Sequence, residues 1–486
     1  MTFIRLRHGL MGSALSLGLL TALSGCMVGP NFTAPRTAVP SAYLDDSPTG
    51  HAPYVSGDAV DPQWWNSFDD PLLTKLETMA VKQNLDLQIA TQRLLESEAQ
   101  AQIEGAKLYP NLEGNAAYSR NKVSDNSPTG MFGAAFPVVT EPYNLYQYGL
   151  QTMFDLDLWG KNRRAVEAAV ANAKASEEAR RAALLNVEAA VATNYIQLRG
   201  TQAVLGITQK NLESANQLVQ LTVERQQAGL TTSLDVANAK ATAAQISSEI
   251  PRLIAQRDAL IGQIGLLLGQ TPQGLPQDLL TPVPVPLTPP TVPVGLPSSL
   301  LTRRPDMREA LDKLHAATAE IGVAKAAFFP DVTLTASASL EAMQFSNLNE
   351  WKSITYGLGP TVTIPIFEGG QLHGQLNLRE AQQKEAAISY AKTALTAFTQ
   401  VNTALVNYTQ EHATQQALQT DVRQSGIALG LAEDQYKQGL VDYLTVLTAQ
   451  QAYLAAQQNQ AQSLEKLGTD LVTLYQALGG GWEGRY

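Results

Sequence analysis

Two long runs without proline constrain the fold of this 486-residue chain more than any other feature. One run extends from Gly160 to Gly229 and the other from Gly370 to Gly439, so both have the same length. A helix of that length would extend roughly 100 Å, at about 1.5 Å per residue. Apolar residues recur in each run at helical spacing. In the first run they are Leu184, Val187, Val191, Tyr195 and Leu198. Because a second helical pattern follows each closing glycine, we predict two very long helical hairpins.

The amino-terminal residues have the pattern of a secretory signal peptide. Arg5 and Arg7 supply positive charge before an apolar run over residues 10–23. The run ends at Cys26, the only cysteine of the chain, in a Leu-Ser-Gly-Cys sequence that resembles a bacterial lipobox. We therefore predict a lipoprotein signal peptide over residues 1–25 and a covalent lipid, such as palmitate, on Cys26. Ordinary secretory cleavage is the alternative.

Composition excludes some classes of partner. The formal net charge of −10 disfavours nucleic acid, because phosphate binding needs a basic patch. Hydrophobic residues make up 44% of the chain and charged residues only 16%, which allows a large core. After the signal peptide, no stretch reaches the ~18 apolar residues that a transmembrane helix needs.

Four segments change from helical spacing to alternation of apolar and polar residues. They are residues 109–120, 145–159, 329–341 and 354–367. In the second segment Tyr146, Tyr148 and Leu150 alternate with Gln147 and Gln151, which predicts strands with one apolar and one polar face. Such strands suit either an ordinary sheet on a core or an outer-membrane barrel. Four strands cannot close a barrel, so the second case requires several copies, eight strands from two or twelve from three.

The chain also repeats itself. Asn84-Leu85-Asp86 matches Arg304-Pro305-Asp306, and Tyr109-Pro110 matches Phe329-Pro330 at the same offset. Asp70 before Pro71 predicts the start of a helix that runs to about Lys107. We divide the mature chain into four segments. They are a leader over 26–70, a first repeat over 71–274, a proline-rich linker over 275–297 and a second repeat over 298–486.

Three features together resemble a known family. They are the Cys26-Met27-Val28-Gly29-Pro30-Asn31-Phe32 segment, Trp64-Trp65 before Asp70-Pro71, and the duplicated strand–hairpin plan. The chain is similar to the outer-membrane factors of tripartite efflux pumps, the TolC family, and within it to the lipoprotein branch typified by OprM and NodT. The resemblance implies a mixed fold of α-helices and transmembrane β-strands. A homotrimer would form a twelve-stranded β-barrel, four strands per protomer, continued by a long periplasmic α-helical barrel of coiled coils.

The same resemblance implies place, partners and activity. The protein would be lipid-anchored in the outer membrane of a Gram-negative bacterium and extend into the periplasm. A periplasmic adaptor, also called a membrane fusion protein, and an inner-membrane pump, commonly of the resistance–nodulation–division (RND) type, would be its partners. It would be a passive conduit that exports small molecules such as drugs, toxic compounds or metals.

Site residues follow from the resemblance at the two hairpin turns. Gly229, Leu230 and Thr231 of the first turn match adaptor-docking positions. The corresponding residues of the second turn are Gly439, Leu440 and Val441. The two glycines also suit the left-handed conformation that a tight helix turn needs, and both explanations can hold.

A periplasmic gate is expected next to these turns. Asp235 and Tyr436 match positions that tie neighbouring helices together, although Asp235 also suits the first turn of a helix. The sequence departs from the TolC pattern at three positions, Val441, Thr445 and Thr448, where charged residues are expected. We therefore consider Glu433 and Asp434 as gate residues, with a solvated helix face as the alternative.

Other classes of function fit less well. The histidines at 51, 315, 373 and 412 lack metal-ligand spacing, and there is no phosphate-binding loop, dinucleotide fingerprint or nucleophile elbow. We therefore expect no enzyme activity, catalytic residue, metal site or cofactor other than the lipid on Cys26. Two alternatives stay open. One is the outer-membrane conduit of a type I protein secretion system, and the other is a periplasmic helical scaffold lipoprotein without a pore.

Overall fold

The structure is a computed structural model. It describes residues 27–36, 43, 55, 56, 58, 60–124, 126–128 and 141–483. The predicted signal peptide and Cys26 lie outside the described residues. The chain divides into two compact units. The first comprises residues 1–34, 95–174 and 312–388, and the second comprises 35–94, 175–311 and 389–486. Each unit takes segments from both sequence repeats, so the units do not coincide with the repeats.

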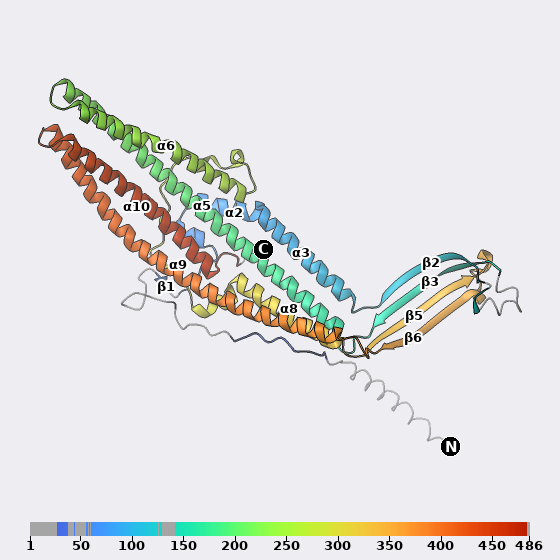
Figure 1. The fold of residues 1–486 in the computed structure, drawn as a ribbon. Helices are drawn as coiled ribbons and strands as arrows, with labels where there is room; N and C mark the ends of the chain where they lie inside the picture. Colours follow the sequence, from blue (N-terminus) through green and yellow to red (C-terminus); the bar gives the residue numbers. More distant parts are fainter. Residues whose placement is uncertain are drawn as a thin grey trace, which may run out of the picture. The chain divides into compact units, whose positions relative to one another are not determined.

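A four-stranded antiparallel sheet belongs to the first unit (Figure 1). Its strands, in hydrogen-bonded order, are β2 (Asn111–Asn121), β3 (Tyr143–Asp155), β5 (Asp331–Ala342) and β6 (Ile354–Thr363). Paired residues always have the same parity, so Tyr148 lies opposite Leu340 and Gln151 opposite Ser337. Because side chains alternate along a strand, this register gathers most apolar residues on one face and polar residues on the other. The predicted strands are confirmed.

Two of the strands end before the alternating pattern does. β3 ends at Asp155, and Asp157 adopts φ +44°, a left-handed conformation that turns the chain toward the next helix. β6 ends at Thr363, shortly before Pro365, which has no N–H to donate to a neighbouring strand. Apolar spacing therefore continues for a few residues into the turns that follow these strands.

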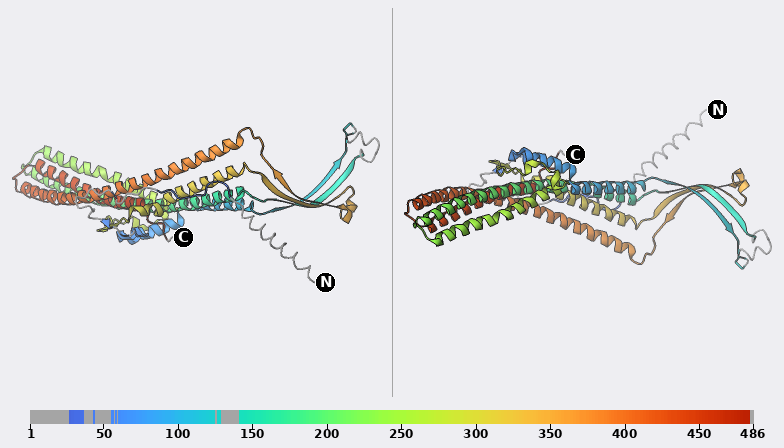
Figure 2. Two further views of the ribbon diagram at one scale, coloured as in Figure 1. Left: turned by 90° about the horizontal axis from the view of Figure 1, so that it is seen from below. Right: turned by 90° about the horizontal axis from the view of Figure 1, so that it is seen from above.

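The two predicted hairpins are confirmed. The first consists of α5 (Lys161–Gln227) and α6 (Ser233–Leu267), and the second of α9 (Gln371–Lys437) and α10 (Tyr443–Leu478). Both long helices have 67 residues. The two hairpin turns lie side by side at one end of the second unit (Figures 1 and 2). Among the described helices, none contains an apolar stretch long enough to cross a bilayer.

The expected single helix from Pro71 to about Lys107 is wrong, because it breaks at Asn84. The chain forms α2 (Pro71–Gln83) and α3 (Leu85–Ala106) instead. The Asn84 side chain donates to the carbonyl of Leu267 (2.8 Å) and accepts from the amide of Leu87 (2.9 Å). It therefore caps α3 and ties the break to α6. The matching position Arg304 lies between α7 (Leu300–Arg303) and α8 (Pro305–Ala326), and its guanidinium donates to the carbonyl of Ala477 on α10 (2.6 Å).

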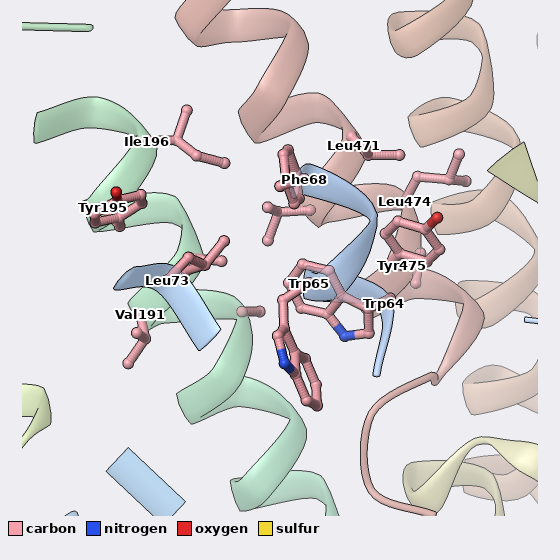
Figure 3. Packing of buried hydrophobic residues seen from close by; sticks show 14 of the residues in the cluster. Trp64, Trp65, Phe68, Leu73, Val191, Tyr195, Ile196, Leu471, Leu474 and Tyr475 are labelled. Atoms are coloured by element: carbon pink, nitrogen blue, oxygen red, sulfur yellow. The ribbon is translucent and has the colours of Figure 1, made fainter. Parts of the chain in front are cut away.

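The Trp-Trp motif lies at the centre of the core of the second unit (Figure 3). Trp64 and Trp65 belong to a 3₁₀ segment, η1 (Trp64–Phe68), and both are fully buried. Trp64 stacks on Tyr475 of α10 with ring centroids 5.2 Å apart. The predicted cap is also confirmed, since the Asp70 carboxylate accepts the first amides of α2 and the hydroxyl of Tyr195 on α5 (2.5 Å).

The leader, the linker and the carboxyl-terminal segment meet within this second unit. Strand β1 (Val55–Ser56) of the leader pairs in parallel with β4 (Val292–Pro293) of the proline-rich linker. Near the end of the chain, the Trp482 indole donates to the carbonyl of Arg303 (3.1 Å). Segments distant in sequence thus contact one another within this unit.

One buried carboxyl predicts a pH-dependent stability. Glu465 of α10 packs against Gly200 of α5, and burial raises its pKa to about 7. An unfolded chain releases this proton near pH 4.3, so the buried carboxyl destabilises the fold increasingly as pH rises from about 4.3 to 7. We expect Glu465→Gln to raise the melting temperature by several degrees at pH 8. The gain should shrink toward pH 4.5 in circular dichroism melts. The exposed Glu213→Gln is the control, and a gain independent of pH would contradict the assignment.

Candidate functional site: the hairpin turns

The two hairpin turns are built alike. Gly229 has φ +73° and Gly439 has φ +78°, and in each turn the glycine amide bonds the carbonyl three residues back. The amides of the following residues, Leu230 and Leu440, bond the carbonyl five residues back. This pattern closes a helix through a left-handed residue, which glycine adopts without strain. The conformational explanation for both glycines therefore holds.

Four leucines project from the turns into solvent. They are Leu230, Leu234, Leu440 and Leu444, which we call the tip leucines. Each is between 61% and 69% exposed, and in both hairpins the second leucine follows the first by four residues. The neighbouring Thr231 and Val441 are half-buried. Exposed apolar side chains that gather at one place on a protein mark interaction surfaces, and these four lie at two neighbouring turns. The sequence analysis did not predict Leu234 and Leu444 as site residues, although the Leu-x-x-x-Leu spacing that both hairpins share could have revealed them.

The helices that leave the turns are both capped by a threonine and an aspartate three residues apart. Thr232 comes before Asp235 in the first hairpin, whereas Asp442 comes before Thr445 in the second. In the first hairpin the Asp235 carboxylate accepts from the hydroxyls of Thr231 and Thr232 (both 2.7 Å). These bonds, that of Thr231 foremost, hold the pKa of Asp235 below its usual range. In the second hairpin the Asp442 carboxylate accepts from the amide and hydroxyl of Thr445. Asp235 thus acts as a capping residue, and Thr445 is its counterpart.

Arg225 joins the two hairpins and was missed by sequence reasoning. Its guanidinium donates from α5 to the carbonyls of Tyr436 (2.8 Å) and Lys437 (3.3 Å) at the end of α9. Such terminal carbonyls have no partner within their own helix and carry the negative end of its dipole. The guanidinium also lies 4.6 Å from the centroid of the Tyr436 ring. The repeat contains a signal, because Arg225 corresponds to the neutral Gln435 in the second hairpin.

Among the described residues, the expected gate residues do not form one cluster. Tyr436 is buried and contacts Arg225 and the ring of Tyr443, not Asp235. Asp434 is exposed and pairs with Lys437 at 3.3 Å, and Glu433 is half-exposed. The positions of Glu433 and Asp434 suit a solvated helix face. In the described ranges, no group of three histidine, cysteine or acidic side chains could hold a metal ion.

The Arg225 contacts predict that the two hairpins separate when this side chain is lost. Removing a charged hydrogen bond and a cation–π contact should cost about 1–3 kcal/mol. We expect Arg225→Ala to broaden the distance distribution between spin labels on cysteines introduced at Gln227 and Gln438. Arg225→Lys should give an intermediate result. Lys240→Ala, which removes an exposed cation from α6, should change nothing, and an unchanged distribution in Arg225→Ala would contradict the assignment.

Comparisons with known proteins agree with this architecture. The family model for the outer membrane efflux protein matches residues 76–270 and 296–480. The solvent efflux pump outer membrane protein SrpC of Pseudomonas putida is 33% identical over 483 residues, covering 96% of this chain and 98% of its own. Outer membrane protein OprJ of Pseudomonas aeruginosa is also 33% identical, over 97% of both chains.

A solved structure gives the same result for the fold. The outer-membrane channel OprN superposes with a TM-score of 0.87 at 31% identity, covering 94% of this chain and all of that one. The family match includes both repeats, each with its strands and its hairpin. The chain therefore belongs to the outer membrane efflux protein family, the TolC-like outer-membrane channels of efflux systems.

Proposed function

We propose that three copies of this chain form one outer-membrane channel whose twelve-stranded barrel is shared between them. The exposed apolar face of the sheet carries the proposal: Tyr356 is 83% exposed and Leu358 75% exposed on the edge strand β6. Lipid is the environment that suits such a face, but lipid does not tolerate unpaired strand edges. The edges of this sheet are β2 and β6, and all neighbours run antiparallel. With four strands per copy, β6 of one copy runs antiparallel to β2 of the next, so a ring can close.

Aromatic side chains at both ends of the sheet support a membrane-spanning role. Tyr146 lies against Tyr118 (4.9 Å between centroids) and Phe345 (5.6 Å) toward the end with the β5–β6 loop. Trp159 stacks on Phe329 (4.6 Å) at the opposite end, next to the helices. Aromatic belts of this kind mark the two interfaces of membrane barrels. The strands have 10 to 13 residues, which is sufficient for a tilted membrane strand.

We infer that the tip leucines dock a periplasmic adaptor, which connects the channel to an inner-membrane pump of the RND type. The leucines occupy equivalent positions in the two hairpins. In a ring of three copies, an adaptor would therefore contact a similar apolar surface at every hairpin turn. The channel itself is a passive conduit without catalytic residues or a cofactor, and Cys26 carries its lipid anchor. The cargo would be small toxic compounds, since relatives are named for solvent and antibiotic efflux. Those names do not favour a protein secretion conduit, and a scaffold without a pore leaves the exposed apolar face unexplained.

The shared barrel predicts a specific covalent link between copies. Asn115 of β2 and Thr361 of β6 lie on the polar face of opposite edges of the sheet. We expect a chain carrying both Asn115→Cys and Thr361→Cys, or a pair shifted by two residues along β2, to form disulfide-linked dimers and trimers in membranes. Each single cysteine should give no trimer in denaturing gels. If no pair along the two edges gives linked oligomers, the shared barrel is wrong.

The docking role predicts a loss of export that leaves the barrel intact. A carboxylate at the centre of an apolar contact costs several kcal/mol in desolvation. We expect Leu230→Asp combined with Leu440→Asp to abolish adaptor pull-down and to reduce export at least tenfold, while heat-resistant oligomers persist. Gln227→Asp, which adds a carboxylate at the same turn without removing an apolar side chain, is the matched control. Normal pull-down in the double variant would refute docking at these leucines.

A further inference from the structure

The segment that follows Cys26 packs against the strand ends and helices of the first unit, to which it belongs. The amide of Val28 donates to the carbonyl of Trp159 (3.1 Å), just beyond the end of β3. Gly29 has φ +93° and packs against Gly322 of α8, where a Cβ on Gly29 would lie 2.5 Å from the Cα of Gly322. Only a pair of glycines allows two backbones to approach so closely. This part of the leader is therefore seated in a complementary surface.

A buried arginine holds the seated segment. Arg164 of α5 is 2% exposed, and its Nη2 donates to the side-chain oxygen of Asn31 (2.6 Å) while its Nε donates to the carbonyl of Val28 (3.3 Å). Its Nη1 donates to the carboxylate of Glu167 (2.7 Å). The rigid guanidinium fork thus binds one acid of its own helix and two oxygens of the leader.

The same carboxylate links the arginine to a second contact with the leader. Glu167 lies 2.8 Å from Nε2 of His315 on α8. Burial alone would raise the pKa of Glu167, but its hydrogen bonds with His315 and Arg164 outweigh burial and lower the pKa. The ionised carboxylate therefore orients both side chains. The His315 ring stacks on Phe32 with centroids 4.4 Å apart and planes 13° apart.

We propose that Arg164, Glu167 and His315 form a docking site for the segment Val28–Phe32 of this chain. The site holds the acyl-bearing end of the leader near the carboxyl-terminal end of β3. Cys26 itself lies outside the described residues, and only Met27 separates it from Val28 in the sequence. The acyl chains then enter the membrane beside the aromatic pair Trp159–Phe329, and the lipid is not a free tether. Docking stands on the contacts alone, whereas the placement of lipid rests on the proposed acylation.

Variants of the leader test docking without touching the helices. A spin label on Thr33→Cys, next to Phe32 and exposed, reports the mobility of the leader in the full-length protein in detergent. We expect a largely immobilised label in the parent. Asn31→Ala should raise the ratio of undocked to docked leader about tenfold, or 1.4 kcal/mol, through the lost Arg164 bond. Phe32→Ala should act in the same direction.

Three further measurements make the outcome decisive. Arg36→Ala, an exposed change on the same leader, should leave the label immobilised, and Arg164→Met should release it while heat-resistant oligomers persist. Equal mobility in the parent and in Asn31→Ala, or equal release by Arg36→Ala, would overturn the docking site. The same thiol-reactive spin label is also applied to the chain without Thr33→Cys, where it would attach only if Cys26 carried a free thiol. That result would contradict acylation while leaving the docking result readable.

Discussion

A sheet that exposes an apolar face and leaves two strand edges unpaired is the constraint on which the rest of this molecule depends. Exposing the apolar face to water is unfavourable, and so is exposing the unpaired backbone groups of the strand edges to hydrocarbon. Both conditions are met when identical sheets join edge to edge within a bilayer. The duplication of the chain fits this requirement, because two repeats give an even number of strands and an antiparallel ring needs one. In the proposed channel, the membrane barrel is thus a property of the assembly.

The hairpin turns show how a duplicated structure can become asymmetric without losing its shape. Backbone hydrogen bonds, glycine conformations and exposed leucines repeat from one turn to the other. Arg225 does not repeat, and it binds the carbonyl end of α9 from the first hairpin. The geometry of the turns is therefore shared by the two hairpins, whereas the link between them is made from one side. An arrangement of this kind can hold the hairpins together while leaving both surfaces free for a partner.

Much of the fold could be predicted from the sequence because its signals are periodic and local. The alternation around Tyr148 and Leu340 predicts both strands and their faces, and Asp70 before Pro71 predicts a helix start. The break at Asn84 could not be predicted, because it depends on a carbonyl of α6 almost 200 residues away. The contacts of Arg225 could not be predicted for the same reason, since its partners belong to the other hairpin. Among the expected gate residues, Asp235 is explained as a helix cap. The lipid attachment at Cys26 stays a prediction.

The molar mass of the purified protein in detergent, measured by light scattering with the detergent subtracted, tests the shared barrel most directly. The account predicts a mass of three protomers and a protein that aggregates when detergent is removed. A monomer that stays folded and soluble without detergent would contradict it, because the apolar face of the sheet would then need neither lipid nor a neighbouring copy.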